Sequence, residues 1–145
     1  MAPSSASASD RIEIEGIPLP GSIQRYFKTA NAGEFEQTAA LFAEDGQLVP
    51  PFEQPIVGRD AIAQYLTAEA TGMSFVPIKS EVPDLSELES DHATSQRHYL
   101  VRGKVKTSLF TVNVAWKFTL NQSQAILVVK VKLLAKLNEL LKLKS

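Results

Sequence analysis

The segment from Tyr99 to Leu134 constrains the fold more than any other part of the sequence, because apolar and polar residues alternate along it. From 99 to 107 the odd positions are uncharged, and arginine or lysine occupies most of the even ones. From 110 to 120 every even position is apolar, and lysine, threonine and other small or polar residues alternate with them. A period of two places each set on its own face of a β-sheet. The pattern therefore predicts two adjacent strands that share one apolar face.

A third strand completes this predicted sheet. Residues 121–124 are typical of a turn, and 125–133 again alternate. The residues expected on the apolar side of this strand are Leu127, Val129, Val131 and Leu133. Together the strands predict an antiparallel meander with one apolar face and one basic, solvated face. Trp116, the only tryptophan of the chain, is expected in the middle of the apolar face.

Helical patterns precede the meander. One helix is predicted to begin at Gly21 with Ser22 as its N-cap, a second to cover 35–42, and a third to end just before Gly72. Each carries apolar residues three and four positions apart, which gives one buried stripe per helix. Helices followed by antiparallel strands indicate an α+β fold, with the helices on one side of a curved sheet.

Shorter elements are predicted between and before these helices. A turn at 44–46 leads to a short strand at 47–49, and 73–78 is expected to be an edge strand. Residues 12–15 alternate as a short strand or extended arm would. A sheet that curls around helices commonly leaves a cavity at its mouth, where small apolar ligands bind.

The remaining segments are predicted from composition. Residues 1–11 are rich in serine and alanine and are expected to be a disordered tail, leaving 12–145 as one domain. Residues 79–91 are expected to be a solvated acidic loop. Leucines recur at three- and four-residue intervals after Leu133, which predicts an amphipathic C-terminal helix.

Composition narrows the function classes. A net charge of −1 argues against nucleic-acid binding, which usually needs a strongly basic surface. The chain has no cysteine and only two histidines, so no metal site is expected. No apolar run approaches the roughly 18 residues of a membrane-spanning helix. These features are typical of a cytoplasmic globular protein.

Several segments resemble a known family. Residues 26–46 are similar to the opening of NTF2-like domains, whose fold is a cone. The segment 48–58, LVPPFEQPIVG, together with 113–118, NVAWKF, resembles the C-terminal domain of the cyanobacterial orange carotenoid protein family. The likeness extends over about residues 12–143 and implies a stand-alone homologue of that domain, because the helical half of the family is absent from this chain.

The resemblance implies a binding site. In the family, a tyrosine on the first helix and a tryptophan on a central strand hydrogen-bond the keto oxygen of a ketocarotenoid such as canthaxanthin or echinenone. Tyr26 and Trp116 occupy the matching positions here. The residues that match the lining of the pigment tunnel, or lie beside it, are Ala70, Phe75, Thr107, Leu109, Phe110, Val129 and Val131.

The family also implies a function. Its stand-alone members carry and deliver carotenoid, quench singlet oxygen in photoprotection, and often form homodimers that share one pigment. Without cysteine, a dimer of this chain must be noncovalent. The expected partners are therefore a second copy, a helical carotenoid-binding domain that accepts the pigment, and transiently the surface of the thylakoid membrane.

Two other classes of function stay open. NTF2-like cones also house isomerases and dehydratases, which use Asp, His or Tyr groups in the pocket. The predicted apolar faces carry no Asp, Glu or His, so we expect no catalytic residues. A pure interaction module that docks through its sheet or final helix is the second alternative.

Overall fold

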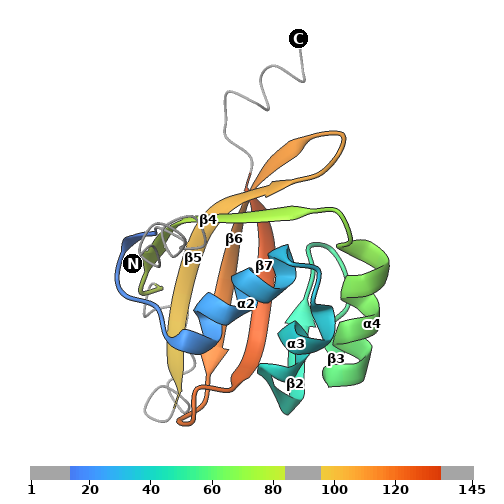
Figure 1. Ribbon diagram of the computed structural model, residues 1–145. Helices are drawn as coiled ribbons and strands as arrows, with labels where there is room; N and C mark the ends of the chain where they lie inside the picture. The colour runs from blue at the N-terminus through green and yellow to red at the C-terminus, as the bar shows by residue number, and fades with distance from the viewer. Residues whose placement is uncertain (1–13, 84–95, 135–145) are drawn as a thin grey trace, which may run out of the picture.

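The computed structural model of the chain describes residues 14–83 and 96–134 (Figure 1). The helices in these ranges are α2 (Gly21–Asn31), α3 (Phe35–Ala40) and α4 (Arg59–Glu69). The strands there are β1 (Glu15–Gly16), β2 (Phe42–Val49), β3 (Ile56–Val57), β4 (Ser74–Glu81), β5 (Arg97–Lys106), β6 (Thr111–Leu120) and β7 (Ile126–Leu134). The predicted tail, most of the predicted acidic loop and the continuation of the predicted C-terminal helix lie outside the described residues.

The strands form one curved sheet in the order β1-β4-β5-β6-β7-β2-β3. From β4 to β7 each strand pairs antiparallel with the next. The alternation predicts the β5–β7 part of this meander. At the two sides of this meander, β1 pairs with β4 and β2 with β7 in parallel. The helices cover one face of the sheet (Figure 1). The predicted α+β fold, a curved and mainly antiparallel sheet wrapped around N-terminal helices, is confirmed.

The covered face of the sheet is the apolar face that the alternation predicts. The register places Trp116 of β6 between Val101 of β5 and Val131 of β7. One step further along the sheet, Phe118 lies opposite Val129. Trp116, Phe118, Val101 and Val129 are all buried. These side chains form the sheet half of the core.

Helix α2 supplies much of the other half. Its buried apolar stripe consists of Ile23, Tyr26, Phe27 and Ala30. The hydroxyls of Thr29 and Thr38 lie 2.6 Å apart and are buried, so a hydrogen bond joins α2 to α3 inside the core. The spacing of three and four residues in the stripe is what lets one helix face contact the sheet along its length.

Two predictions about the helices are wrong in detail. Ser22 is not the N-cap: the carbonyl of Pro20 accepts the N–H groups of Ile23 and Gln24, and Ser22 lies inside the first turn. The second helix ends at Ala40, and Phe42 already begins β2, which runs through the predicted turn at 44–46. Pairing of β2 with β7 explains this, because a neighbouring strand draws the chain into the sheet.

The ends of two predicted strands also need correction. β7 shifts register between its pairs with Thr119 and Leu120, so Ile126 is fully buried and Leu127 only half-buried, contrary to the predicted alternation. Leu133 and Leu134 belong to β7 and do not begin a helix. Likewise 79–81 extend β4 and are not part of a loop.

Of the short strand or extended arm predicted at 12–15, residues 12 and 13 lie outside the described residues, and Glu15 begins the two-residue strand β1. Glu15 and Gly16 pair in parallel with Lys79 and Ser80 of β4. Gly16 has a φ of +109°, and a Cβ there would lie 2.0 Å from the Ser80 carbonyl oxygen. Only glycine fits so close to the neighbouring backbone. The arm covers part of the β4 edge, and no strand within residues 14–83 and 96–134 pairs with the stretch around Phe75 and Pro77 on that side.

Candidate ligand-binding site

Tyr26 lies on the face of α2 that contacts the sheet. Its side chain is 4% exposed, and its ring meets the ring of Phe118 edge to face, with centroids 5.2 Å apart. A second edge-to-face contact joins it to Phe27 at 5.3 Å. These are the arrangements that aromatic quadrupoles favour, and they fix the direction of the phenol.

Trp116 lies on the opposite wall, in the middle of β6. It is 1% exposed, and its ring meets the ring of Phe27 at 4.8 Å and 82°. Phe27 therefore contacts both Tyr26 and Trp116, while Phe118 contacts Tyr26 and Phe27. The two residues expected to bind a keto oxygen thus belong to one buried aromatic cluster, which we define as Tyr26, Phe27, Trp116 and Phe118.

Both polar atoms of this cluster are available as donors. Among residues 14–83 and 96–134, no hydrogen bond uses the Tyr26 hydroxyl or the Trp116 indole N–H. The one fully buried side-chain polar atom without a partner in these ranges is the Ser22 hydroxyl, so the Tyr26 and Trp116 donors are not themselves completely enclosed. A phenol and an indole without protein partners, in one cluster, are suited to a ligand that brings an acceptor.

The protonation state of Tyr26 suits donation. Burial raises its pKa far above the usual value of 10.0, and the neighbouring Tyr65 phenol adds to this rise. Tyr65 donates a hydrogen bond to Glu53 Oε2 at 3.2 Å. Burial, the Glu53 carboxylate and the charge of Glu69 raise the pKa of Tyr65 to about 12. Both phenols therefore keep their protons at neutral pH.

The other predicted lining residues fall into two groups. Ala70 and Val129 are buried, and Phe75 and Val131 are half-buried against the core. The remaining three, Thr107, Leu109 and Phe110, form the turn between β5 and β6. There Leu109 is 85% exposed and Phe110 is 57% exposed. The first group lies in or next to the core, and the second lies at the surface.

An apolar rim connects these two groups along the covered face of the sheet. We define it as Phe75, Val112, Val131 and Leu133 of the sheet, together with Phe110 of the turn that precedes β6. Phe75 and Val112 both lie opposite Val105, and Leu133 lies opposite Val114. Leu133 is 45% exposed, although it is apolar and on the covered face. The helices therefore cover the sheet near Trp116 but leave it open towards the β5–β6 turn.

Some members of this arrangement were not predicted as site residues. Phe27 and Phe118 complete the aromatic cluster, and Val112 and Leu133 complete the rim. The alternation places Val112 and Phe118 on the face of Trp116, so that pattern was a usable signal for both. The same alternation places Leu133 on the apolar side of the third strand, and its pairing with Val114 confirms this, although the leucine spacing also favoured a helix from Leu133 onward.

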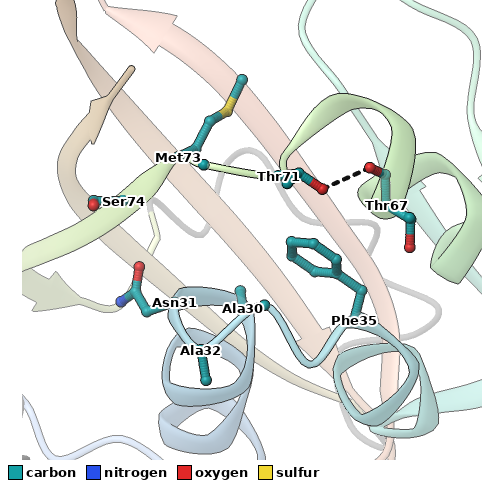
Figure 2. A pocket seen from close by; sticks show the side chains of 10 residues that line it. Ala30, Asn31, Ala32, Phe35, Thr67, Thr71, Met73 and Ser74 are labelled. Atoms are coloured by element: carbon teal, nitrogen blue, oxygen red, sulfur yellow. Dashed lines mark hydrogen bonds between the residues drawn. The ribbon is translucent and has the colours of Figure 1, made fainter. Parts of the chain in front are cut away.

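A surface pocket of about 450 Å³ lies elsewhere, between the ends of α2 and α4 and the start of β4 (Figure 2). Its lining includes Asn31, Phe35, Thr67 and Met73 but none of the nine predicted site residues. The Thr71 hydroxyl, at its edge, donates to the Thr67 carbonyl at 2.7 Å. With polar groups already bonded within its own wall, this pocket is a weaker candidate than the aromatic cluster.

Two other features are absent from the same part of the chain. The described residues contain no group of three or more His, Cys, Asp or Glu side chains that could hold a metal ion. None of the described helices is both long and apolar enough to cross a membrane.

Comparison with known proteins agrees with the fold. Residues 23–125 match the SnoaL-like domain family. The chain is 34% identical to the orange carotenoid-binding protein of Limnospira maxima, across 97% of this chain and 43% of that protein. The alignment therefore spans less than half of that relative.

Solved structures give the same result. The orange carotenoid protein of Anabaena (Nostoc) sp. PCC 7120, solved with canthaxanthin, superposes with a TM-score of 0.73 and 34% identity, covering 91% of this chain and 41% of that one. An NTF2-like protein with a cystatin-like fold from Novosphingobium aromaticivorans, 18% identical, superposes with a TM-score of 0.60 over 83% of this chain and 82% of that one. The predicted NTF2-like fold and the resemblance to the C-terminal domain of the orange carotenoid protein are both confirmed.

Proposed function

This chain belongs to the SnoaL-like domain family, and we propose that it is a non-enzymatic member that binds a ketocarotenoid. The observation that carries the proposal is the buried aromatic cluster, in which the Tyr26 phenol and the Trp116 indole have no hydrogen-bond partner among the described residues. Homology to a protein solved with canthaxanthin supports the choice of ligand.

Apolar contact supplies most of the affinity. Taking on the order of 300 Å² of polyene surface out of water at about 25 cal/mol per Å² contributes roughly 7 kcal/mol before entropy losses. A hydrogen bond to the carbonyl adds only about 0.5–1.5 kcal/mol. Tyr26 and Trp116 therefore orient the pigment and tune its colour, whereas the rim and the core wall hold it.

The residues buried in the described part of the chain support a binding protein over an enzyme. The buried polar side chains there are Ser22, Thr29, Thr38 and Ser80. None of these is a general acid or base with a pKa near neutral, and the pKa of Tyr26 is raised away from that range. Isomerases and dehydratases of this fold would need such a group beside the ligand.

Finer parts of the function follow from the same ligand. A domain that holds one end of a polyene carries it, delivers it to a helical carotenoid-binding acceptor, and quenches singlet oxygen in photoprotection. We expect these steps in the cytoplasm and at the thylakoid surface. A second copy, bound without covalent links, covers the half of the pigment that emerges past the rim.

The first prediction tests the donors. Protein produced in cells that make canthaxanthin or echinenone should be coloured, with absorption shifted to the red relative to the free pigment. Replacing Tyr26 and Trp116 together by phenylalanine should abolish most of that shift, because both hydrogen bonds to the carbonyl are lost. An absorption spectrum of the purified protein measures the result.

Tyr99→Phe is the matched control, since it removes a phenol from β5 outside the aromatic cluster. Its spectrum should equal that of the wild type. Circular dichroism verifies that each variant folds. A folded double variant with the full red shift would overturn the assignment of Tyr26 and Trp116.

A further inference from the structure

The turn between β5 and β6 presents apolar side chains on a rigid frame. The Thr107 N–H donates to the Phe110 carbonyl at 2.8 Å, and the Thr107 hydroxyl oxygen accepts the N–H groups of Leu109 and Phe110 at 3.2 and 3.0 Å. These bonds hold the turn closed, yet Leu109 and Phe110 are 85% and 57% exposed. In Figure 1 this hairpin projects beyond the rest of the sheet.

Basic residues accompany this hairpin. Between 97 and 134 the chain contains no Asp or Glu, and its basic residues there are Arg97, Arg102, Lys104, Lys106, Lys117, Lys130 and Lys132. The whole chain has a net charge of −1, so positive charge is concentrated in β5–β7. Lys104, Lys106 and Lys132 are exposed. Arg102 of this region forms an ion pair with Glu81 at 3.5 Å.

The lysines lie on the face opposite the rim. Lys104 is opposite Asn113, and Lys132 is opposite Ala115, the residue that also faces Arg102. Together with the turn, these positions form an apolar tip with a cationic collar. We define the membrane tip as Leu109 and Phe110, and the collar as Lys104, Lys106 and Lys132.

We propose that this hairpin docks on an anionic lipid bilayer, with Leu109 and Phe110 inserted at the interface and the collar against the headgroups. Anionic headgroups complement the collar, and each lysine near such a surface strengthens binding by about fivefold. Apolar side chains at the interface add to this attraction.

Other occupants fit the surface less well. A second copy docked hairpin to hairpin would bring two basic collars together, and like charges repel; the loaded dimer proposed above instead covers the apolar rim on the other face. Single-stranded nucleic acid uses aromatic platforms beside its basic groove. The outward-facing side of β5–β7 offers only the ring of His98, near the end of β5 that lies away from the turn. A flat anionic surface matches both features of the hairpin at once.

Docking gives the rim a role in the exchange of pigment between the bilayer and the protein, an inference that rests on the proposed function. Phe110 belongs to both the membrane tip and the rim, so insertion of the tip places the open end of the sheet against lipid. A polyene could then pass between bilayer and domain without crossing water. A dimer that covers the rim would also cover Phe110, so docking belongs to the monomer.

The second prediction tests docking with pigment-free protein, so that the result does not depend on whether the protein binds a carotenoid. The wild type should pellet with vesicles of phosphatidylcholine and phosphatidylglycerol when these are sedimented. Much less protein should pellet with vesicles of phosphatidylcholine alone. Binding should weaken as salt rises. Lys104→Glu with Lys106→Glu should weaken binding at least tenfold, and Leu109→Ser with Phe110→Ser should weaken it comparably.

Arg97→Glu is the matched control, a charge reversal at the other end of β5 that should weaken binding less than threefold. Pigment uptake by the lysine variant, measured in detergent, should be unchanged, which separates docking from ligand binding. Equal sedimentation of the wild type and both double variants would overturn the proposal. So would self-association without vesicles that the serine variant abolishes, because a second copy would then occupy the tip.

Discussion

His98 lies on the solvated face of β5, where two neighbours on β6 influence its charge. Its Nδ1 is 3.2 Å from the Thr119 hydroxyl, and burial followed by the positive charge of Lys117 lowers its pKa from 6.5. The folded protein therefore resists protonation of His98 more than the unfolded chain does. Between the two pKa values the unfolded state binds more protons, and stability falls as the pH falls.

The third prediction concerns the effect of His98 on stability at different pH values. The free energy of unfolding should be highest above pH 7 and should decline as pH drops through the unfolded pKa of His98, near 6.5. Urea denaturation at several pH values measures this dependence. In His98→Gln the decline between pH 7 and pH 6 should be reduced, and an identical pH profile for both proteins would contradict the assignment.

The aromatic cluster shows how much of the candidate site could be predicted from individual residues of the sequence. Tyr26 and Trp116 were predicted as a pair only through the family resemblance, because a tyrosine on a helical stripe and a tryptophan on an apolar strand face are usually core residues. Their meeting depends on Phe27, which contacts both rings. No local pattern specifies that contact, since it depends on how α2 crosses the sheet.

At the scale of elements, Asn31 ties the end of α2 to the exposed edge of β4. Its amide donates to the Phe75 carbonyl at 2.8 Å and accepts the Phe75 N–H at 2.6 Å. β1 pairs with Lys79 and Ser80, and in the described part of the chain no strand lies beside Phe75 on that side. The Asn31 side chain thus hydrogen-bonds the backbone N–H and carbonyl of Phe75 as a neighbouring strand would. This makes it less favourable for another chain to pair with this edge.

The fourth prediction concerns this tie. Asn31→Ala should lower the free energy of unfolding by about 1–2 kcal/mol, because two hydrogen bonds of modest net value are lost. Asn31→Asp should cost at least as much, since it keeps the acceptor but turns an oxygen towards the Phe75 carbonyl. Asn113→Ala, on the solvated face of β6, is the control and should stay within about 0.5 kcal/mol of the wild type. A stable Asn31→Ala would contradict this role.

Elements with a strong local period were predicted well, and those set by distant neighbours were not. β5 and β6 follow from alternation alone, because each strand has one buried face. The parallel pair β2–β7 was not predicted, because its two strands lie about 80 residues apart in the sequence. The register shift between β6 and β7 near Ile126 was not predicted either, because strict alternation assumes a regular pairing. Leu133 and Leu134 fit helical spacing and a strand equally well, and pairing with β6 decides between them.

For the whole molecule, the open end of the sheet predicts the oligomeric state of the loaded form. Helices cover Trp116, but Leu133 and Phe110 remain 45% and 57% exposed. A pigment anchored at the aromatic cluster would leave part of its length beside these residues and in water. A second copy removes that apolar surface from solvent, which favours association in proportion to the area covered.

The fifth prediction is that the pigmented protein sediments as a dimer, with one carotenoid per two chains, and that removing the pigment shifts the population towards monomer. Analytical ultracentrifugation at the pigment's absorption maximum measures the loaded species directly. Leu133→Asp should weaken the loaded dimer while leaving the pigment-free monomer folded. A pigmented species of monomer mass would contradict shared binding.

The position of β7 between β6 and β2 also bears on how the protein is made. A ribosome releases the helices and β2 first, yet β2 has no partner in the meander until residues 126–134 emerge from the exit tunnel. Nascent chains stalled before residue 126 should therefore expose Phe42 and Trp116 to chaperones and proteases, and resistance to digestion should arise abruptly once this last strand is available.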